Sequence, residues 1–255
     1  MTPTSKTYRG VALVTGASVG IGEATVRRLV ADGWQVVATA RRADRLEALA
    51  AELGAAVRPL ALDVTDAAAV AALPDTCPVV DLLVNNAGLA LGLKSAQESS
   101  LSDWETMVQT NITGLLRVTH ALLPGMVARG RGHVINVGSI AGRFPYPGGH
   151  VYGATKAFVH QLTLALKSDF VGTAVRATVI EPGMVAGSEF SVVRFEGDAE
   201  RAASIYAGAE PLQPSDVAEA IAWVAAQPPH VNVTVLQLMP VCQGPGPQLI
   251  HRRPV

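Results

Sequence analysis

Short runs of Val, Leu and Ile alternate along this chain with longer segments of helical periodicity. Runs such as VALVTG and VDLLVN are apolar on successive residues, which is typical of strands covered by helices on both faces. The alternation predicts repeated βα units and therefore an α/β fold with a doubly wound parallel sheet of about seven strands. We expect strands near 11–16, 35–40, 58–63, 80–85, 133–138, 174–180 and 233–238, and helices near 20–32, 43–53, 66–73, 101–128, 152–171 and 215–226.

The length fits one domain, because α/β folds of roughly 200–250 residues commonly form a single unit. The 255 residues contain no internal repeat and no linker, so we expect one domain over 1–255. Two regions are irregular. Residues 183–213 are too long for an ordinary connection, which predicts a lid over a site. The tail, 240–255, is rich in Pro and Gly and is expected to be disordered, or else packed on a neighbouring subunit.

Charge and composition exclude several classes of protein. The 20 basic and 21 acidic side chains give a net charge of −1, which supports neither nucleic-acid nor membrane-surface binding. The polar start lacks a signal peptide, and the charge-free stretch Val231 to Ile250 holds too many polar and Pro residues to span a membrane. Cys77 and Cys242 lie far apart and are expected to be reduced, and the histidines have no metal-ligand spacing. We expect a cytoplasmic protein without a metal.

A glycine-rich turn follows the first expected strand and opens directly into a helix. Its sequence, TGASVGIG at 15–22, lets Gly16 form the tight turn, Gly20 admit a pyrophosphate and Gly22 pack the helix on the strand. This spacing predicts a Rossmann-type dinucleotide site. The alternative is a glycine loop that merely turns the chain.

The second expected strand ends at Arg41 and Arg42, where sites that prefer NAD carry an acid. Guanidinium groups suit a 2′-phosphate, because they offer planar, charged donors to phosphate oxygens. The cofactor expected is therefore NADP. In the alternative interpretation the two arginines belong to a solvated helix start with Asp44 and Arg45.

Two later strand ends carry further candidates. Asp63-Val64 places a carboxylate either near the adenine amino group or as the cap of the next helix. The small residues of NNAG, at 85–88, would let the backbone lie close to the adenosine ribose, unless they form a plain turn.

A phenol, an ammonium and a hydroxyl are expected at the same edge of the sheet. Tyr152 and Lys156 share one face of a helix, and the ammonium would lower the pKa of the phenol for acid–base work. Ser139 ends a strand and could donate to a substrate oxygen, and Asn111, in the long expected helix, could bind a water linked to Lys156. The alternatives are a strand-end hydroxyl and an exposed helix amide.

The order of these motifs resembles the short-chain dehydrogenase/reductase superfamily, from Val11 to about Pro240. The resemblance implies a catalytic tetrad of Asn111, Ser139, Tyr152 and Lys156, a segment from Pro182 to Ser188 along the nicotinamide, and a homotetramer. The residues that it implies for NADP are Gly16, Ser18, Gly20, Ile21, Gly22, Arg41, Arg42, Asp63, Val64, Asn86, Gly88, Tyr152, Lys156, Pro182, Gly183, Val185 and Ser188.

A narrower resemblance lies in NNAGLALG, ALLPGMV, IEPG, GSEFSVVRFEGD and PLQPSDVAEAI, although the tail after Cys242 departs from it. These segments are similar to NADP-dependent 3-hydroxy acid dehydrogenases, also called serine or allo-threonine dehydrogenases. The implied reaction is oxidation of a small 3-hydroxy acid, with Ser139 and Tyr152 on the substrate hydroxyl. Arg194 in the lid-like segment, or Arg143, would bind the carboxylate, unless Arg194 is a surface residue paired with Glu189 or Glu196.

Three other interpretations concern activity. His150 stands two residues before Tyr152 and is expected to line the pocket or the surface. The chain could instead be a broad NADPH carbonyl reductase for neutral ketones and aldehydes. It could also be a non-catalytic dinucleotide-binding regulator, although all four tetrad residues are present.

Overall fold

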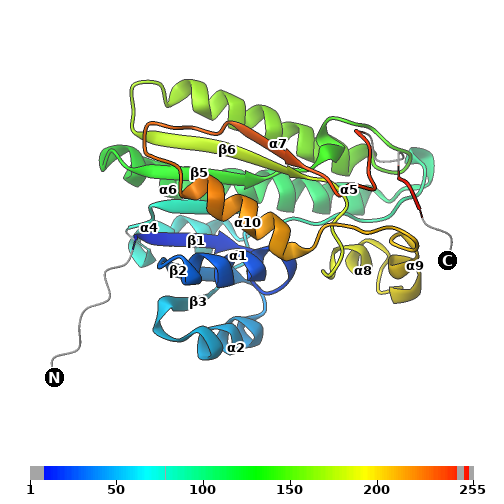
Figure 1. The fold of residues 1–255 in the computed structure, drawn as a ribbon, viewed down its shortest axis with the longest axis horizontal. Coiled ribbons are helices and arrows are strands. Elements are labelled where there is room, and N and C mark those ends of the chain that lie inside the picture. The colour runs from blue at the N-terminus through cyan, green and yellow to red at the C-terminus, as the bar shows by residue number, and fades with distance from the viewer. Residues whose placement is uncertain (1–8, 78, 246–249, 253–255) are drawn as a thin grey trace.

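The computed structural model describes residues 9–77, 79–245 and 250–252. Within them, seven parallel strands form one sheet in the order β3-β2-β1-β4-β5-β6-β7 (Figure 1). The predicted fold class is thereby confirmed. The strands are β1 (Val11–Thr15), β2 (Gln35–Ala40), β3 (Val57–Ala61), β4 (Leu82–Asn85), β5 (Gly132–Val137), β6 (Val175–Pro182) and β7 (Val235–Leu238).

Helices connect the strands on both faces of the sheet. The described helices are α1 (Gly20–Ala31), α2 (Ala43–Leu53), α3 (Ala67–Ala71), α4 (Leu73–Thr76), α5 (Leu101–Val108), α6 (Leu115–Ala128), α7 (His150–Asp169), α8 (Phe190–Arg194), α9 (Ala199–Ser204) and α10 (Pro214–Ala225). Single 3-10 turns cover Gly54–Ala56, Ala96–Glu98 and Ile140–Gly142.

Two apolar cores sandwich the sheet, because successive strand residues face opposite sides. On one face, Val26 and Leu29 of α1 and Ile221 of α10 pack against Val14 and Val84. On the other face, side chains of α3, α6 and the end of α7 pack against the neighbouring strand residues Leu13 and Leu83. Burial on both faces explains why the strands are continuous apolar runs.

Strand β1 pairs with β2 on one side and with β4 on the other, so the chain reverses its direction of winding between β1 and β4. A crevice forms at the carboxyl ends of the strands at such a switch point, and ligands of α/β sheets bind there. The two short helices of the lid-like segment, α8 and α9, lie at this end of the molecule (Figure 1).

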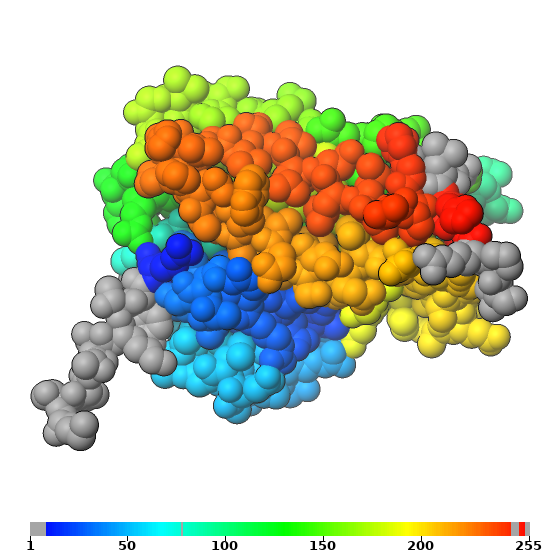
Figure 2. Space-filling model, in the orientation of Figure 1, coloured from blue at the N-terminus to red at the C-terminus, as the bar shows by residue number. Residues whose placement is uncertain are grey.

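Three expectations about the elements need correction. The expected helix 101–128 is divided into α5 and α6 by a π-helical turn at Gln109–Gly114. The segment 183–213 contains α8 and α9, so it is partly helical. Residues 240–245 and 250–252 of the tail lie beside that segment (Figure 2). Arg252 donates to the carbonyls of Ile205 (2.9 Å) and Ala207 (2.5 Å). Residues 246–249 and 253–255 lie outside the described residues.

Candidate active site

A cavity of about 1170 Å³ opens at the carboxyl ends of the strands. It is lined by residues of the glycine turn, the ends of β2 to β6, the start of α7 and the lid-like segment. Of the residues singled out from the sequence for cofactor, catalysis or substrate, Gly22, Asn111 and the alternative substrate residue Arg143 do not line it, and the others do. The structure therefore brings distant motifs together in one place.

The glycine turn is shaped by close backbone contacts. Gly16 and Gly20 have φ angles of +66° and +59°, which side chains rarely adopt. A Cβ on Gly22 would lie 2.2 Å from the carbonyl oxygen of Gly16, so the helix can approach the turn only at a glycine. Asn86 fixes the turn from β4, where its Nδ2 donates to the carbonyl oxygens of Thr15 (2.9 Å) and Gly16 (3.2 Å).

Three arginines and one carboxylate gather beyond the end of β2. Arg42 donates from Nε and Nη2 to Ser18 Oγ (3.3 and 3.1 Å) and from Nη1 to Glu189 Oε2 (2.7 Å). Arg45 pairs with the other oxygen of Glu189 at 2.8 Å. Arg41 is exposed and lines the cavity. Glu189, from the lid-like segment, holds the two guanidinium groups.

Asp63 does not cap the following helix. Its Oδ1 accepts hydrogen bonds from the backbone N (2.9 Å) and Oγ1 (2.8 Å) of Thr65, and the cap of α3 is Asp66. Burial raises the pKa of the Asp63 carboxyl, but the hydrogen bonds from Thr65 and the charge of Arg41 outweigh it and lower the pKa overall. The carboxylate is therefore ionised at the rim of the cavity, and the capping interpretation is wrong.

Ser139, Tyr152 and Lys156 meet where β5 ends against the first turns of α7. Tyr152 and Ser139 are hydrogen-bonded through their side chains, and Ser139 Oγ also accepts from the backbone N of Ala141 (3.1 Å). Lys156 is buried and donates from Nζ to the carbonyl oxygen of Val137 (2.7 Å). Its Nζ lies 5.9 Å from the centre of the Tyr152 ring.

The acid–base properties of this group differ from the expectation. Burial raises the pKa of Tyr152 to about 12, the charge of Arg194 lowers it, Tyr146 raises it, and the hydrogen bond with Ser139 lowers it. Burial also lowers the pKa of Lys156 to about 8. The net shift of the Tyr152 pKa is thus upward, opposite to the expected direction, because burial outweighs the positive charge of Arg194.

Asn111 is buried behind the cavity wall, with 2% of its surface exposed, and is not an exposed helix amide. Its Oδ1 accepts from the backbone N of Leu89 (2.9 Å), and its Nδ2 donates to the Leu89 carbonyl (2.8 Å) and to Thr155 Oγ1 (3.1 Å). The side chain ties the π-helical turn to the loop after β4 and to α7.

Arg194 ends α8 and reaches the catalytic end of the cavity. Its guanidinium carbon lies 5.2 Å from the centre of the Tyr152 ring and 5.0 Å from that of Phe190, and Nη2 donates to the Tyr146 hydroxyl (3.0 Å). The Nε atom is buried and has no hydrogen-bond partner among the described residues. Glu189 is engaged by Arg42 and Arg45 instead, so the expected alternative pairing of Glu189 with Arg194 is wrong.

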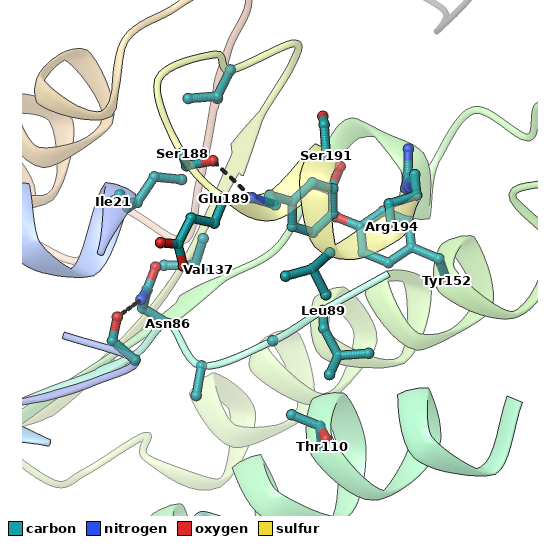
Figure 3. Close-up of a pocket in the computed structure, with 18 of the residues that line it drawn as sticks. Ile21, Asn86, Leu89, Thr110, Val137, Tyr152, Ser188, Glu189, Ser191 and Arg194 are labelled. Carbon is teal, nitrogen blue, oxygen red and sulfur yellow. Dashed lines mark hydrogen bonds between the residues drawn. The ribbon is translucent and has the colours of Figure 1, made fainter. Parts of the chain in front are cut away.

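The two ends of α8 face different parts of the cavity. Glu189 precedes the helix and lies toward Ile21 and Asn86, whereas Arg194 closes the helix beside Tyr152 (Figure 3). The five residues between and including Phe190 and Arg194 span about 7.5 Å as a helix. One short element thereby contacts both the arginine cluster and the catalytic end.

Comparison with known proteins establishes the family. The model of the family described as short chain dehydrogenase matches residues 10–197. This chain is a short-chain dehydrogenase. It is 53% identical over 246 residues to the NADP-dependent 3-hydroxy acid dehydrogenase YdfG of Salmonella typhi, covering 95% of this chain and 99% of that one. It is 52% identical over 239 residues to the serine 3-dehydrogenase of Agrobacterium fabrum, covering 92% and 95%.

Solved structures show the same relationship. The closed form of a serine dehydrogenase complexed with NADP⁺ has a TM-score of 0.91 and 50% identity, covering 95% of this short-chain dehydrogenase and 100% of that chain. The serine dehydrogenase from Escherichia coli has a TM-score of 0.81 and 47% identity, covering 92% and 99%.

Sequence reasoning about this short-chain dehydrogenase missed Tyr146, Glu189 and Phe190 as parts of the site. No local motif marks them, because each contacts a residue far away along the chain: Tyr146 contacts Arg194, Phe190 contacts Tyr152, and Glu189 contacts Arg42. The length of the lid-like segment was the one feature of the sequence that could have indicated Glu189 and Phe190 as residues of the site.

Two other candidates lie elsewhere in this short-chain dehydrogenase. Arg143 pairs with the buried Glu181 (2.7 Å) and does not line the large cavity, so it is unsuited to bind a substrate there. His150 Nε2 lies 3.2 Å from Ser99 Oγ, outside that cavity.

Across residues 9–77, 79–245 and 250–252, no group of three or more His, Cys, Asp or Glu is placed to hold a metal ion. None of the helices described is long and apolar enough to cross a membrane.

Proposed function

We propose that this protein is an NADP-dependent oxidoreductase that oxidises the hydroxyl group of a small 3-hydroxy acid, of the serine, allo-threonine, 3-hydroxyisobutyrate or 3-hydroxypropionate type. The observation that carries the proposal is the guanidinium of Arg194, 5.2 Å from the centre of the Tyr152 ring. A positive charge next to the proton-transferring group favours a substrate whose carboxylate lies close to its reacting hydroxyl. The names of the relatives at about half identity support the same substrate class.

The cavity fits NADP. The glycine turn has the shape that a pyrophosphate site needs, because a Cβ at Gly16 or Gly22 would meet backbone atoms within about 3 Å and would force the turn apart. Arg41 and Arg42 line the cavity beyond β2 and supply cationic donors for the 2′-phosphate. Asp63, Val64, Asn86 and Gly88 would line the adenosine, and residues from Pro182 to Ser188 the nicotinamide. When bound, NADP⁺ supplies the acceptor for the hydride that leaves the substrate carbon.

The residues around the substrate hydroxyl divide the remaining work. Tyr152 as phenolate takes the hydroxyl proton, and Ser139, hydrogen-bonded to Tyr152, holds the same oxygen. Lys156, with its pKa lowered to about 8, can exchange a proton with solvent near neutral pH. Asn111 acts as a positioning residue, because it fixes Leu89 and Thr155 around this group.

The Arg194 subsite explains why an acid would be preferred to a neutral alcohol. The guanidinium is held by Tyr146 and stacked against Phe190, and its buried Nε has an unused donor. A substrate carboxylate at this end of the cavity would be attracted by the positive charge of Arg194. Because α8 belongs to the lid-like segment, the subsite is completed only when this segment covers the cavity.

The test is initial-rate NADP⁺ reduction with L-serine, L-allo-threonine, 3-hydroxyisobutyrate, 3-hydroxypropionate and neutral secondary alcohols, repeated with NAD⁺. We expect turnover of the acids with NADP⁺, and a loss of about a thousandfold or more in Tyr152→Phe. Arg194→Ala should raise KM for the acids far more than for a neutral alcohol. Reaction of neutral carbonyl compounds alone, in the reverse direction, would favour the carbonyl reductase and remove the role of Arg194. Absence of any turnover in a protein that binds NADP would favour the non-catalytic regulator.

We also propose a homotetramer in the cytoplasm. The resemblance to the family supports the assembly, and large apolar side chains exposed on α5 and α6, including Leu101 and Leu116, offer surface for it. The free thiols of Cys77 and Cys242 suit a reducing compartment. Sedimentation equilibrium tests the assembly, and a monomer mass would contradict it.

A further inference from the structure

Glu189 lies where the proposed function needs only positive charge. The residue precedes α8, and its two carboxylate oxygens accept from Arg42 (2.7 Å) and Arg45 (2.8 Å). These hydrogen bonds lower the pKa of the Glu189 carboxyl, so it is ionised at neutral pH. The lid-like segment thus delivers an anion to the arginine that is expected to bind the 2′-phosphate.

The hydrogen bonds of Arg42 show which of its N–H donors Glu189 uses. A guanidinium has five N–H groups and binds a phosphate best with two parallel N–H groups of one edge. In Arg42, Nε and Nη2 form the edge that donates to Ser18, and Nη1, on the other edge, donates to Glu189. Three of the five N–H groups are therefore engaged, and a phosphate that binds either edge of Arg42 must use a nitrogen that already donates to Ser18 or Glu189. Ser18 is neutral, whereas Glu189 repels a phosphate.

We propose that Glu189 is a coenzyme-specificity residue, which competes with the 2′-phosphate of NADP for Arg42 and so limits the preference for NADP over NAD. This inference rests on the proposed function, because it assumes that the dinucleotide binds along the glycine turn. Arg45 weakens the competition, because it forms an ion pair with Glu189. With that pair formed, Arg41 and Arg42 supply the remaining positive charge beyond the end of β2.

Electrostatics gives the expected change in affinity for the 2′-phosphate when the charge of Glu189 is removed. The pair is half-exposed, so a high effective dielectric applies. Removing the negative charge of Glu189, which shares Arg42 with the phosphate dianion, should strengthen binding of the phosphate by about five- to tenfold. A ligand without the phosphate should gain little, and the gain should shrink at high salt.

Two variants separate charge from packing. Glu189→Gln keeps the size and removes the charge, while Glu189→Asp keeps the charge on a shorter side chain. The control is Glu196→Gln, which removes the same charge from an exposed residue of the same lid-like segment. Within the described part of the chain, Glu196 forms no ion pair with Arg41, Arg42 or Arg45.

The experiment measures Kd by titration calorimetry for NADP⁺, NAD⁺, 2′,5′-ADP and 5′-AMP. We expect Glu189→Gln to bind NADP⁺ and 2′,5′-ADP about five- to tenfold more tightly, with NAD⁺ and 5′-AMP unchanged within about twofold. Glu189→Asp and Glu196→Gln should resemble the wild type. Unchanged or weaker binding of 2′,5′-ADP by Glu189→Gln would overturn the competition, as would equal gains in the Asp variant. A wild type that binds neither NADP⁺ nor 2′,5′-ADP would overturn the proposed function itself.

Discussion

Tyr152 keeps its proton at neutral pH in this structure, because burial raises its pKa to about 12. Oxidation of an alcohol needs the phenolate, whereas reduction of a carbonyl needs the phenol. We therefore predict that kcat/KM for oxidation rises by about tenfold per pH unit below the apparent pKa. Reduction should be nearly constant over the same range. Paired pH profiles of the two directions check this, and an oxidation rate independent of pH between 6 and 8 would contradict it.

A substitution of Arg194 tests in a second way whether the Tyr152 pKa sets the pH dependence of oxidation. Its positive charge lowers the pKa of Tyr152, so Arg194→Gln should move the rise of kcat at saturating substrate to higher pH. Arg201→Gln removes an equal charge from the lid-like segment, where Arg201 stacks on Phe195. That control should leave the profile in place.

At the residue scale, sequence motifs predicted the groups that carry chemistry better than their partners. The glycine turn, Ser139, Tyr152 and Lys156 line one cavity, because the turn follows β1, Ser139 follows β5, and Tyr152 and Lys156 lie in the first turns of the next helix. The partners of Arg42 and Arg194 were not predictable, since Glu189 is 147 residues from Arg42 and Tyr146 is 48 residues from Arg194. The pKa of Tyr152 also depends on burial, which a sequence motif does not contain.

At the element scale, the π-helical turn between α5 and α6 depends on Asn111. We predict that Asn111→Leu lowers the free energy of unfolding by about 2 kcal/mol, because the N–H and carbonyl of half-buried Leu89 both lose their partner. Urea denaturation measures the loss. Gln109→Leu, at an exposed position of the same turn, is the control and should change little. Equal stability of the two variants would show that the Asn111 contacts do not hold the turn.

Long amphipathic segments were the most predictable elements, and their interruptions were the least. The apolar pattern of 101–128 continues through the π-helical turn, so periodicity alone gives one helix. The turn arises because an amide there bonds to a different part of the chain, which a local pattern does not record. The same reason applies to the tail, where Arg252 contacts the carbonyls of Ile205 and Ala207, about 45 residues earlier in the chain.

On the scale of the whole molecule, Lys156 is a buried cation that the fold tolerates at a cost. Its pKa is lowered to about 8, below the ordinary 10.5, so the unfolded chain binds more protons between these values. Stability from this group therefore rises with pH above 8, by up to about 1.4 kcal/mol per unit. We predict that Lys156→Met loses this rise between pH 8 and 9.5, as measured by urea denaturation. A variant with the same slope as the wild type would contradict the assignment.

The sheet as a whole was predictable because its signals agree with one another. Apolar runs, helical periods and the glycine turn all indicate a doubly wound sheet, and the observed order β3-β2-β1-β4-β5-β6-β7 places their ends along one cavity. The lid-like segment was expected from its length alone, without α8 and α9.

Helix α8 carries a carboxylate at one end and a guanidinium at the other, over about 7.5 Å. If α8 moves as a rigid body, binding of the coenzyme at one end changes the binding of the acid at the other end. If the 2′-phosphate displaces Glu189, Arg194 moves with it, so coenzyme and acid should bind with a coupling free energy. Reciprocity then requires that the acid change the affinity for NADP⁺ by the same factor as NADP⁺ changes the affinity for the acid.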